Sequence, residues 1–220
     1  MGTRGLTVII KDGKVKLSQY QQYDSYFSET GVEFIDFCNR VLNNPRKTDK
    51  FENKIKRLQH VTKKYMAECD KVLELLNTKK YKLGINQLFP QFSRDTGVDI
   101  LDIIYNLRDY EYHDEQKYPI YIDICEDGWI EYANIINFDT QEIYLTTANF
   151  SLLNPIEFKT VGNLYQQYNC YLKYSFYAIP TVEQAIKDYN KMIKDNNIKA
   201  DEIEVDNIID RERPQFKQYI

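Results

Sequence analysis

Residues 1–31 read MGTRGLTVIIKDGKVKLSQYQQYDSYFSETG, and this stretch decides the fold. Residues 3–10 are rich in β-branched side chains, and Val15 and Leu17 alternate with polar neighbours on the other side of the KDGK sequence at residues 11–14. An Asp-Gly pair between two such runs is a strong signal for a two-residue hairpin loop. The sequence therefore predicts an N-terminal β-hairpin.

A run of polar and aromatic residues, QYQQYDSY at residues 19–26, follows the hairpin. It has too few aliphatic side chains to form a core and too many rings for a solvent-exposed linker. We interpret it as a candidate functional surface. Its candidate ligand-binding residues are Gln19, Tyr20, Gln22, Tyr23, Asp24 and Tyr26.

Composition narrows the class of protein. The chain has 220 residues, 43% of them hydrophobic, and a formal net charge of −4, which argues against a protein that coats nucleic acid. Its four cysteines form no C-x-x-C pair, and no signal peptide or long apolar run is present, so we expect a cytoplasmic protein without a membrane span. With two histidines and no Cys/His cluster, we expect no metal site and no cofactor.

Four helices are predicted from apolar faces at helical spacing, with starts near Thr30, Thr48, Thr96 and Thr181. Thr30 and Glu33 have the spacing of a capping box. The 4-3-4-3 spacing of apolar residues after Thr48 predicts one long helix, or two nearly collinear ones, forming a helical arm at about 46–78. Its first half is basic, which is typical of a solvated face and also suits an acidic partner or a phosphate.

Two nine-residue segments resemble each other: ETGVEFIDF at residues 29–37 and DTGVDILDI at residues 95–103. One interpretation is that both are the same local way to start a helix. The other is that two helix N-termini present N–H groups to one ligand, a geometry that favours anions.

Residues 118–148 change to alternating periodicity with two turn signals, which predicts an antiparallel meander. The expected fold is α+β, with the hairpin and the meander in one mainly antiparallel sheet packed by amphipathic helices. We expect a single domain over residues 1–195 and a loosely docked acidic tail over residues 196–220.

Several segments together resemble a family of small proteins common in bacteriophages and mobile elements: MGTRGLT at 1–7, QYQQYDSY at 19–26, SRDTG at 93–97, EYA at 131–133 and INFD at 136–139. Members look like G-T-R-N-L-T at the start and Q-Y-G-Q-W-D-G-Y-P in the loop, and this chain differs at Gln21, Tyr23, Ser25 and Phe27. The resemblance covers most of residues 1–147. It implies a phage accessory protein that disables host immunity by sequestering or cleaving nucleotide signals, or by blocking an effector.

Three hypotheses follow for the chemistry. As an enzyme, the chain would use Asp24 or Asp95 as a general base. The Thr-Arg start also has a weak similarity to N-terminal-nucleophile hydrolases of the bile-salt-hydrolase type, which would make the fold a sandwich, although Gly2 offers no nucleophile. As a protein inhibitor, it would dock on a host defence protein through the tyrosine-rich loop or the basic helix.

The third hypothesis, which we favour, is a binding protein that neutralises a small phosphorylated or nucleotide signal. Arg4 and Arg94 would hold phosphates, the Thr-Gly helix starts, including Thr96, would add N–H groups, and tyrosines would stack on a base. This hypothesis predicts that Arg4, Asp24 and Arg94 converge at one end of the sheet.

Overall fold

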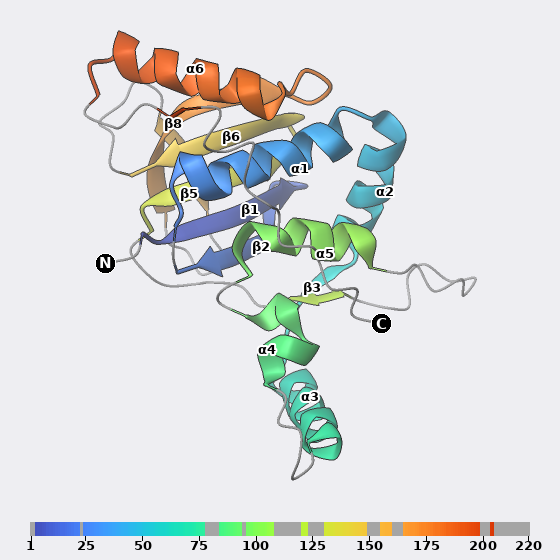
Figure 1. Ribbon diagram of the computed structural model, residues 1–220. Coiled ribbons are helices and arrows are strands. Elements are labelled where there is room, and N and C mark those ends of the chain that lie inside the picture. The colour runs from blue at the N-terminus through green and yellow to red at the C-terminus, as the bar shows by residue number, and fades with distance from the viewer. Residues whose placement is uncertain are drawn as a thin grey trace.

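A six-stranded mixed sheet forms the centre of the computed structural model (Figure 1). The structure describes residues 3–22, 24–77, 84–93, 96–107, 120–122, 130–148, 155–159, 165–198 and 203–204. The strand order is β2-β1-β5-β6-β8-β7, and within this sheet, as far as its strands are described, β1 and β5 are the one parallel pair of neighbours. The strands are β1 (Gly5–Lys11), β2 (Lys14–Gln21), β5 (Tyr132–Asn137), β6 (Glu142–Thr147), β7 (Pro155–Lys159) and β8 (Tyr165–Ser175). The prediction of an α+β fold with one mainly antiparallel sheet is confirmed.

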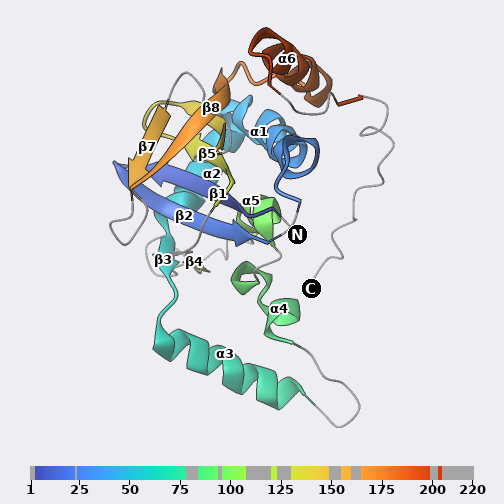
Figure 2. The ribbon, with the colours of Figure 1, turned by 90° about the vertical axis from the view of Figure 1, so that its left-hand side faces the viewer.

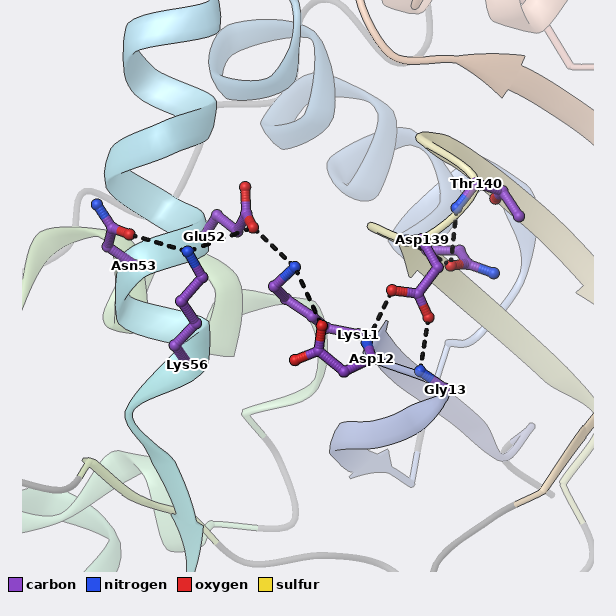
Figure 3. A network of polar contacts seen from close by, with 9 residues as sticks. Lys11, Asp12, Gly13, Glu52, Asn53, Lys56, Asp139 and Thr140 are labelled. Carbon is purple, nitrogen blue, oxygen red and sulfur yellow. Dashed lines mark hydrogen bonds and ion pairs between the residues drawn. The ribbon is translucent and has the colours of Figure 1, made fainter.

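The N-terminal hairpin is confirmed, and its turn is tied to a second turn of the sheet (Figure 3). Asp12 and Gly13 have φ angles of 55° and 65°, the left-handed values that a type I′ turn requires. Their backbone N–H groups donate to the carboxylate of Asp139 at 2.7 and 2.8 Å. Asp139 lies in the turn between β5 and β6, so one carboxylate joins two hairpins.

The predicted meander shares the sheet with the hairpin through its β5–β6 part. These two strands pair in antiparallel register, with Ile136 opposite Ile143. The strand expected before them, β4 (Ile120–Ile122), pairs in parallel with β3 (Leu58–His60) in a separate two-stranded sheet. Leu58 and Ile122 are buried in the larger hydrophobic core, which explains why this short pair is held against the body of the protein.

Helices α1 (Val32–Leu42), α5 (Ile100–Asn106) and α6 (Val182–Asp195) pack on one face of the main sheet (Figures 1 and 2). The predicted apolar face of α1 is confirmed, because its six members are all buried: Phe34, Ile35, Phe37, Cys38, Val41 and Leu42. The opposite face of the sheet carries a smaller buried cluster around Val8 and Ile135. Thr181 caps α6 by accepting a hydrogen bond from the Gln184 backbone N–H at 3.3 Å, as the sequence predicts.

The predicted capping box at the start of α1 is wrong. The helix is preceded by one π-helical turn (Phe27–Gly31), in which the Tyr26 carbonyl accepts from the N–H groups of Glu29 and Gly31 at 3.2 Å. Neither Tyr26 nor Gly31, the two N-cap positions, makes a side-chain cap. The predicted cap residue Thr30 lies inside the turn and is buried, so the backbone starts the helix without it.

The prediction of one helical arm is wrong over its first half. The chain forms α2 (Pro45–Lys56), then β3, then α3 (Lys63–Leu76), and the two helices point in different directions (Figures 1 and 2). Phe51 and Ile55 on α2 are fully buried, so α2 belongs to the core and α3 alone projects.

The basic face on α2 is only partly a solvated surface. Lys54 is 2% exposed, and its ammonium donates to the backbone carbonyls of Tyr105, at 2.8 Å, and Leu107. Pairing with these carbonyls at the end of α5 explains how a lysine is tolerated in the interior. The remaining basic residues that are exposed are Arg46, Lys47, Lys50, Lys56, Lys63 and Lys64.

Little of the predicted acidic tail falls among the described residues. Asn190 on α6 exchanges two hydrogen bonds with the backbone of Ile203, at 2.9 and 3.0 Å, and Ile203 packs against the core. In the described part of the chain, no helix has the length and apolar character needed to cross a membrane.

Candidate functional site

The loop after β2 folds back over the start of β1. The Ser25 backbone N–H donates to Thr3 Oγ1 at 2.9 Å, and the Ser25 hydroxyl donates to the Thr3 carbonyl at 3.3 Å, both in buried positions. A Cβ on Gly5 would lie 2.5 Å from Ser25 Oγ, so the crossing requires glycine there. The crossing brings the segment around Asp24 next to the segment around Arg4.

Arg4, Asp24, Tyr26 and Tyr132 lie around this crossing, and we call them the rim. The Arg4 carbonyl accepts from the Tyr132 N–H at 3.2 Å. The ring of Tyr26 meets the ring of Tyr132 edge to face, with 5.8 Å between centroids. Arg4 and Asp24 are exposed, and Tyr26 is 46% exposed. The rim therefore presents a guanidinium, a carboxylate and an aromatic edge to solvent.

The other predicted ligand-binding residues do not share one surface. Gln19 is buried on the helix-covered face of the sheet, and Gln22 is half-buried. Tyr20 packs against the smaller cluster on the opposite face, because side chains alternate along a strand. Tyr20 and Gln19 therefore lie on opposite faces of the sheet, and stacking of Tyr20 on a base stays a prediction. Thr96 uses its hydroxyl to donate to the Pro90 carbonyl.

Three predicted site residues, Tyr23, Arg94 and Asp95, lie outside the described residues. The structure brings Arg4 and Asp24 to the same end of the sheet, and their convergence with Arg94 stays a prediction. The neighbouring Ser93 is placed: its carbonyl accepts from Gln19 Nε2 at 2.8 Å, which holds this segment against the end of β2.

Three polar side chains, Gln19, Thr7 and Asn134, cross the helix-covered face in one line, which we call the polar row. Thr7 on β1 pairs with Gln19 on β2 and with Asn134 on β5. Their exposed fractions are 4%, 1% and 6%. Two residues further along the strands, the equivalent line is apolar and fully buried: Leu17, Ile9 and Ile136.

The hydrogen-bonding capacity of the polar row is largely unused. Gln19 Nε2 donates to the carbonyls of Ser93 and Tyr20, whereas Gln19 Oε1 is buried without a partner. Within the described ranges, the side chains of Thr7 and Asn134 make no hydrogen bond to protein groups. An unpaired buried polar group costs about 1–3 kcal/mol, so the buried Gln19 Oε1 is an unfavourable feature of the free protein.

Two Thr-Gly turns stand at the ends of the polar row. A Cβ on Gly31 would lie 2.7 Å from Phe27 Cδ2 in the same turn, and 3.4 Å, an ordinary contact distance, from Leu145, which pairs with Asn134. A Cβ on Gly97 would lie 2.3 Å from Gln21 Oε1, and Gln21 is on the same side of β2 as Gln19. Gly31 therefore leaves room for the Phe27 ring, whereas Gly97 has a φ of 50°, which favours glycine, and lies close to the side chain of Gln21.

The described thiols are poor nucleophiles. Burial raises the pKa of Cys170 to about 11, and it raises the pKa of Cys38 well above its ordinary value. The pKa of Cys69 is raised by burial and by the neighbouring Asp70. Since the thiolate is the reactive form, these three cysteines offer little nucleophile at neutral pH.

Thr7 and Asn134 are not among the site residues that the sequence predicts. The available signal was a polar residue inside an apolar strand: Thr7 is flanked by Leu6 and Val8, and Asn134 by Ala133 and Ile135. Only the register of β1 with β5 reveals that the two interruptions are neighbours.

Among the described residues, no group of three or more His, Cys, Asp or Glu side chains is arranged to hold a metal ion. Comparison of the chain with known protein families, with curated proteins and with solved structures gives no match in any of the three.

Proposed function

We propose that this protein binds a small phosphorylated or nucleotide ligand at the rim and the polar row, and thereby withdraws an immune signal from a host defence pathway. One observation carries the proposal: Gln19 Oε1, which is buried and has no hydrogen-bond partner, lies near the same end of the sheet as the exposed Arg4 and Tyr26. Tyr132 precedes Asn134 by two residues on the same face of β5, a separation of about 7 Å along the strand. A nucleotide is long enough to contact both groups of residues.

The rim supplies the contacts that a nucleotide requires. Arg4 makes no ion pair within the described residues, so its guanidinium is available for bidentate contact with a phosphate. The ring of Tyr26, held by Tyr132, offers a surface for stacking, which contributes about 1–3 kcal/mol per base. The use of the ligand as an immune signal is carried by the resemblance to phage accessory proteins.

Calorimetric titration with a panel of nucleotides tests the proposal, after mass spectrometry of small molecules that co-purify with the protein. Arg4→Ala and Tyr26→Ala should each weaken binding about tenfold, with the urea midpoint unchanged. Matched controls are Arg46→Ala and Tyr177→Ala, because both residues are exposed on other parts of the surface. The proposal fails if no nucleotide binds, or if the rim variants bind as tightly as the controls.

The same titration separates sequestration from hydrolysis. If Asp24 acts as a general base, incubation with the bound nucleotide should yield product, and Asp24→Asn should stop its formation. Recovery of unchanged nucleotide supports sequestration. Asp24 is exposed at the rim with a φ of 53°.

A second candidate function, inhibition of a host defence protein, is favoured by the projecting helix α3. Near its C-terminal end, Leu75 is 83% exposed, with Leu76 and Val72 at 48% and 42%. Exposed apolar side chains gathered on one projecting element are typical of protein interfaces. Phage growth on a defence-carrying host discriminates the two functions: loss with Leu75→Glu but not with Arg4→Ala would establish the protein inhibitor.

A further inference from the structure

We infer that helix α3 is a dimerisation element, on which a second copy of this chain packs in antiparallel orientation. The inference goes beyond the proposed function, because it concerns the projecting helix and not the rim (Figure 2). One side of α3 packs on the body of the protein: Cys69 is 3% exposed, and the ring of Tyr65 meets the ring of Phe92 edge to face, with 6.2 Å between centroids.

A line of exposed side chains runs along another side of α3, and we call it the α3 stripe. Its members follow the spacing i, i+4, i+7, i+8 and i+11, which places them on one face of a helix. They are Lys64, Glu68, Lys71, Val72 and Leu75. Leu75 is the most exposed of the two apolar members, at 83%. The stripe therefore combines apolar side chains with charges of both signs.

The charges at the two ends of α3 oppose the helix dipole. Lys63 and Lys64 are exposed in the first turn, where the dipole is positive, and Glu74 is exposed in the last turn, where it is negative. Within the described residues, the charged members of the stripe, Lys64, Glu68 and Lys71, form no ion pair. A partner helix with the reverse order of charges would balance both ends.

A second copy of α3 has the reverse order of charges when it lies antiparallel. If the two helices overlap fully, Glu68 lies opposite the partner's Lys71, because the two residues are equally far from the two ends of the helix. Leu75 lies opposite the partner's Lys64, whose aliphatic stem can cover it. Two-fold symmetry makes each of these contacts twice. A parallel pair would instead place like charges together.

The balance of charge on α3 favours a second copy over a strongly acidic or basic partner. The helix has three lysines and three acidic residues: Lys63, Lys64, Lys71, Glu68, Asp70 and Glu74. A partner of one charge sign would therefore meet like charges along the stripe. A helix of 14 residues is about 21 Å long, so the interface belongs to the small class, below about 1,200 Å². We expect a weak dimer in exchange with the monomer.

Sedimentation equilibrium of the full chain tests the inference, at concentrations from about 10 µM to about 1 mM, a range suited to a weak interface. Glu68→Lys and Lys71→Glu should each weaken dimerisation about tenfold, because each creates two like-charge contacts across the two-fold axis. An equimolar mixture of the two variants should recover the wild-type affinity, since their charges are complementary. A local defect in the fold of either variant would not be rescued by mixing.

Glu183→Lys is the matched control. Glu183 is an exposed residue of α6 that pairs with Lys187, and the substitution changes the net charge by the same amount as Glu68→Lys. It should leave dimerisation unchanged, which separates a contact on α3 from a general effect of protein charge.

A wild-type chain that stays monomeric at every concentration would overturn the inference, and so would a monomer that binds a host protein through Leu75. A dimer that both single variants retain at wild-type affinity would also overturn it, because the interface would then lie elsewhere. Failure of the mixture to recover the affinity would overturn the antiparallel arrangement. None of these results bears on nucleotide binding at the rim, so the proposed function stands or falls separately.

Discussion

Asp36 and Asp102 bind the same guanidinium, although 66 residues separate them in the chain. Arg40 donates through Nε to Asp36 at 2.7 Å and through Nη2 to Asp102 at 2.8 Å. The two aspartates occupy equivalent positions in the similar segments 29–37 and 95–103. The similarity therefore marks two helices, α1 and α5, that lie on the same face of the sheet and are joined by one arginine. Their starts differ, since a π-helical turn precedes α1 and a 3₁₀ turn (Gly97–Asp99) precedes α5.

Removing this shared arginine should loosen α5 from α1. We expect Arg40→Met to lower the free energy of unfolding by about 1 kcal/mol, because two partly exposed ion pairs are lost together. Urea denaturation measures the change. The control Lys187→Met removes an isolated exposed pair with Glu183 on α6 and should have no measurable effect. Equal stability of the two variants would show that the arginine does not couple the helices.

Asp139 should stabilise the N-terminal hairpin from outside it. Asp139→Ala leaves the N–H groups of Asp12 and Gly13 without their carboxylate, and should lower the free energy of unfolding by about 1–2 kcal/mol. Hydrogen exchange of these two amides should accelerate in the variant. Asp49→Ala, an exposed aspartate on α2, is the control for loss of charge. Unchanged exchange at both amides would contradict the prediction.

Features determined by local sequence could be predicted. The Asp12-Gly13 turn and the Thr181 cap both depend on residues within a few positions, and both are confirmed. The break between α2 and α3 could not be predicted, because no proline or glycine interrupts residues 57–62. It arises where Leu58–His60 pairs with β4, a contact between segments far apart in the chain.

Some residues of the candidate site could likewise be identified from the sequence, and others could not. Arg4, Asp24 and Tyr26 could be named as candidates because charged and aromatic residues are concentrated next to the predicted hairpin. Thr7 and Asn134 required the parallel pairing of β1 with β5, which joins strands more than 120 residues apart. Periodicity identifies a strand and its two faces but not its neighbour in the sheet.

Stability should fall in acid through Glu52. A hydrogen bond from Lys11, at 2.7 Å, lowers the pKa of Glu52 in the folded protein below its ordinary 4.5 (Figure 3). A lowered folded pKa contributes stability that is present above the unfolded pKa and is lost as pH falls through the folded pKa. Urea midpoints measured from neutral pH to about pH 3 should therefore fall less in Glu52→Gln than in the wild type. Lys11→Met should reduce the acid dependence in the same way, and a wild-type slope in both variants would contradict the assignment.

Lys54 should anchor the C-terminal end of α5. Its ammonium is almost completely buried and donates to the carbonyls of Tyr105 and Leu107 at the end of the helix. Lys54→Met keeps the aliphatic part of the side chain and removes the donor to these two carbonyls, so the free energy of unfolding should fall by about 1–3 kcal/mol. Lys56→Met, an exposed lysine on the same helix, should change it by less than about 0.5 kcal/mol. If urea denaturation gives the same value for both variants, the buried ammonium contributes no more than an exposed one, and the lysine is tolerated in the core rather than required there.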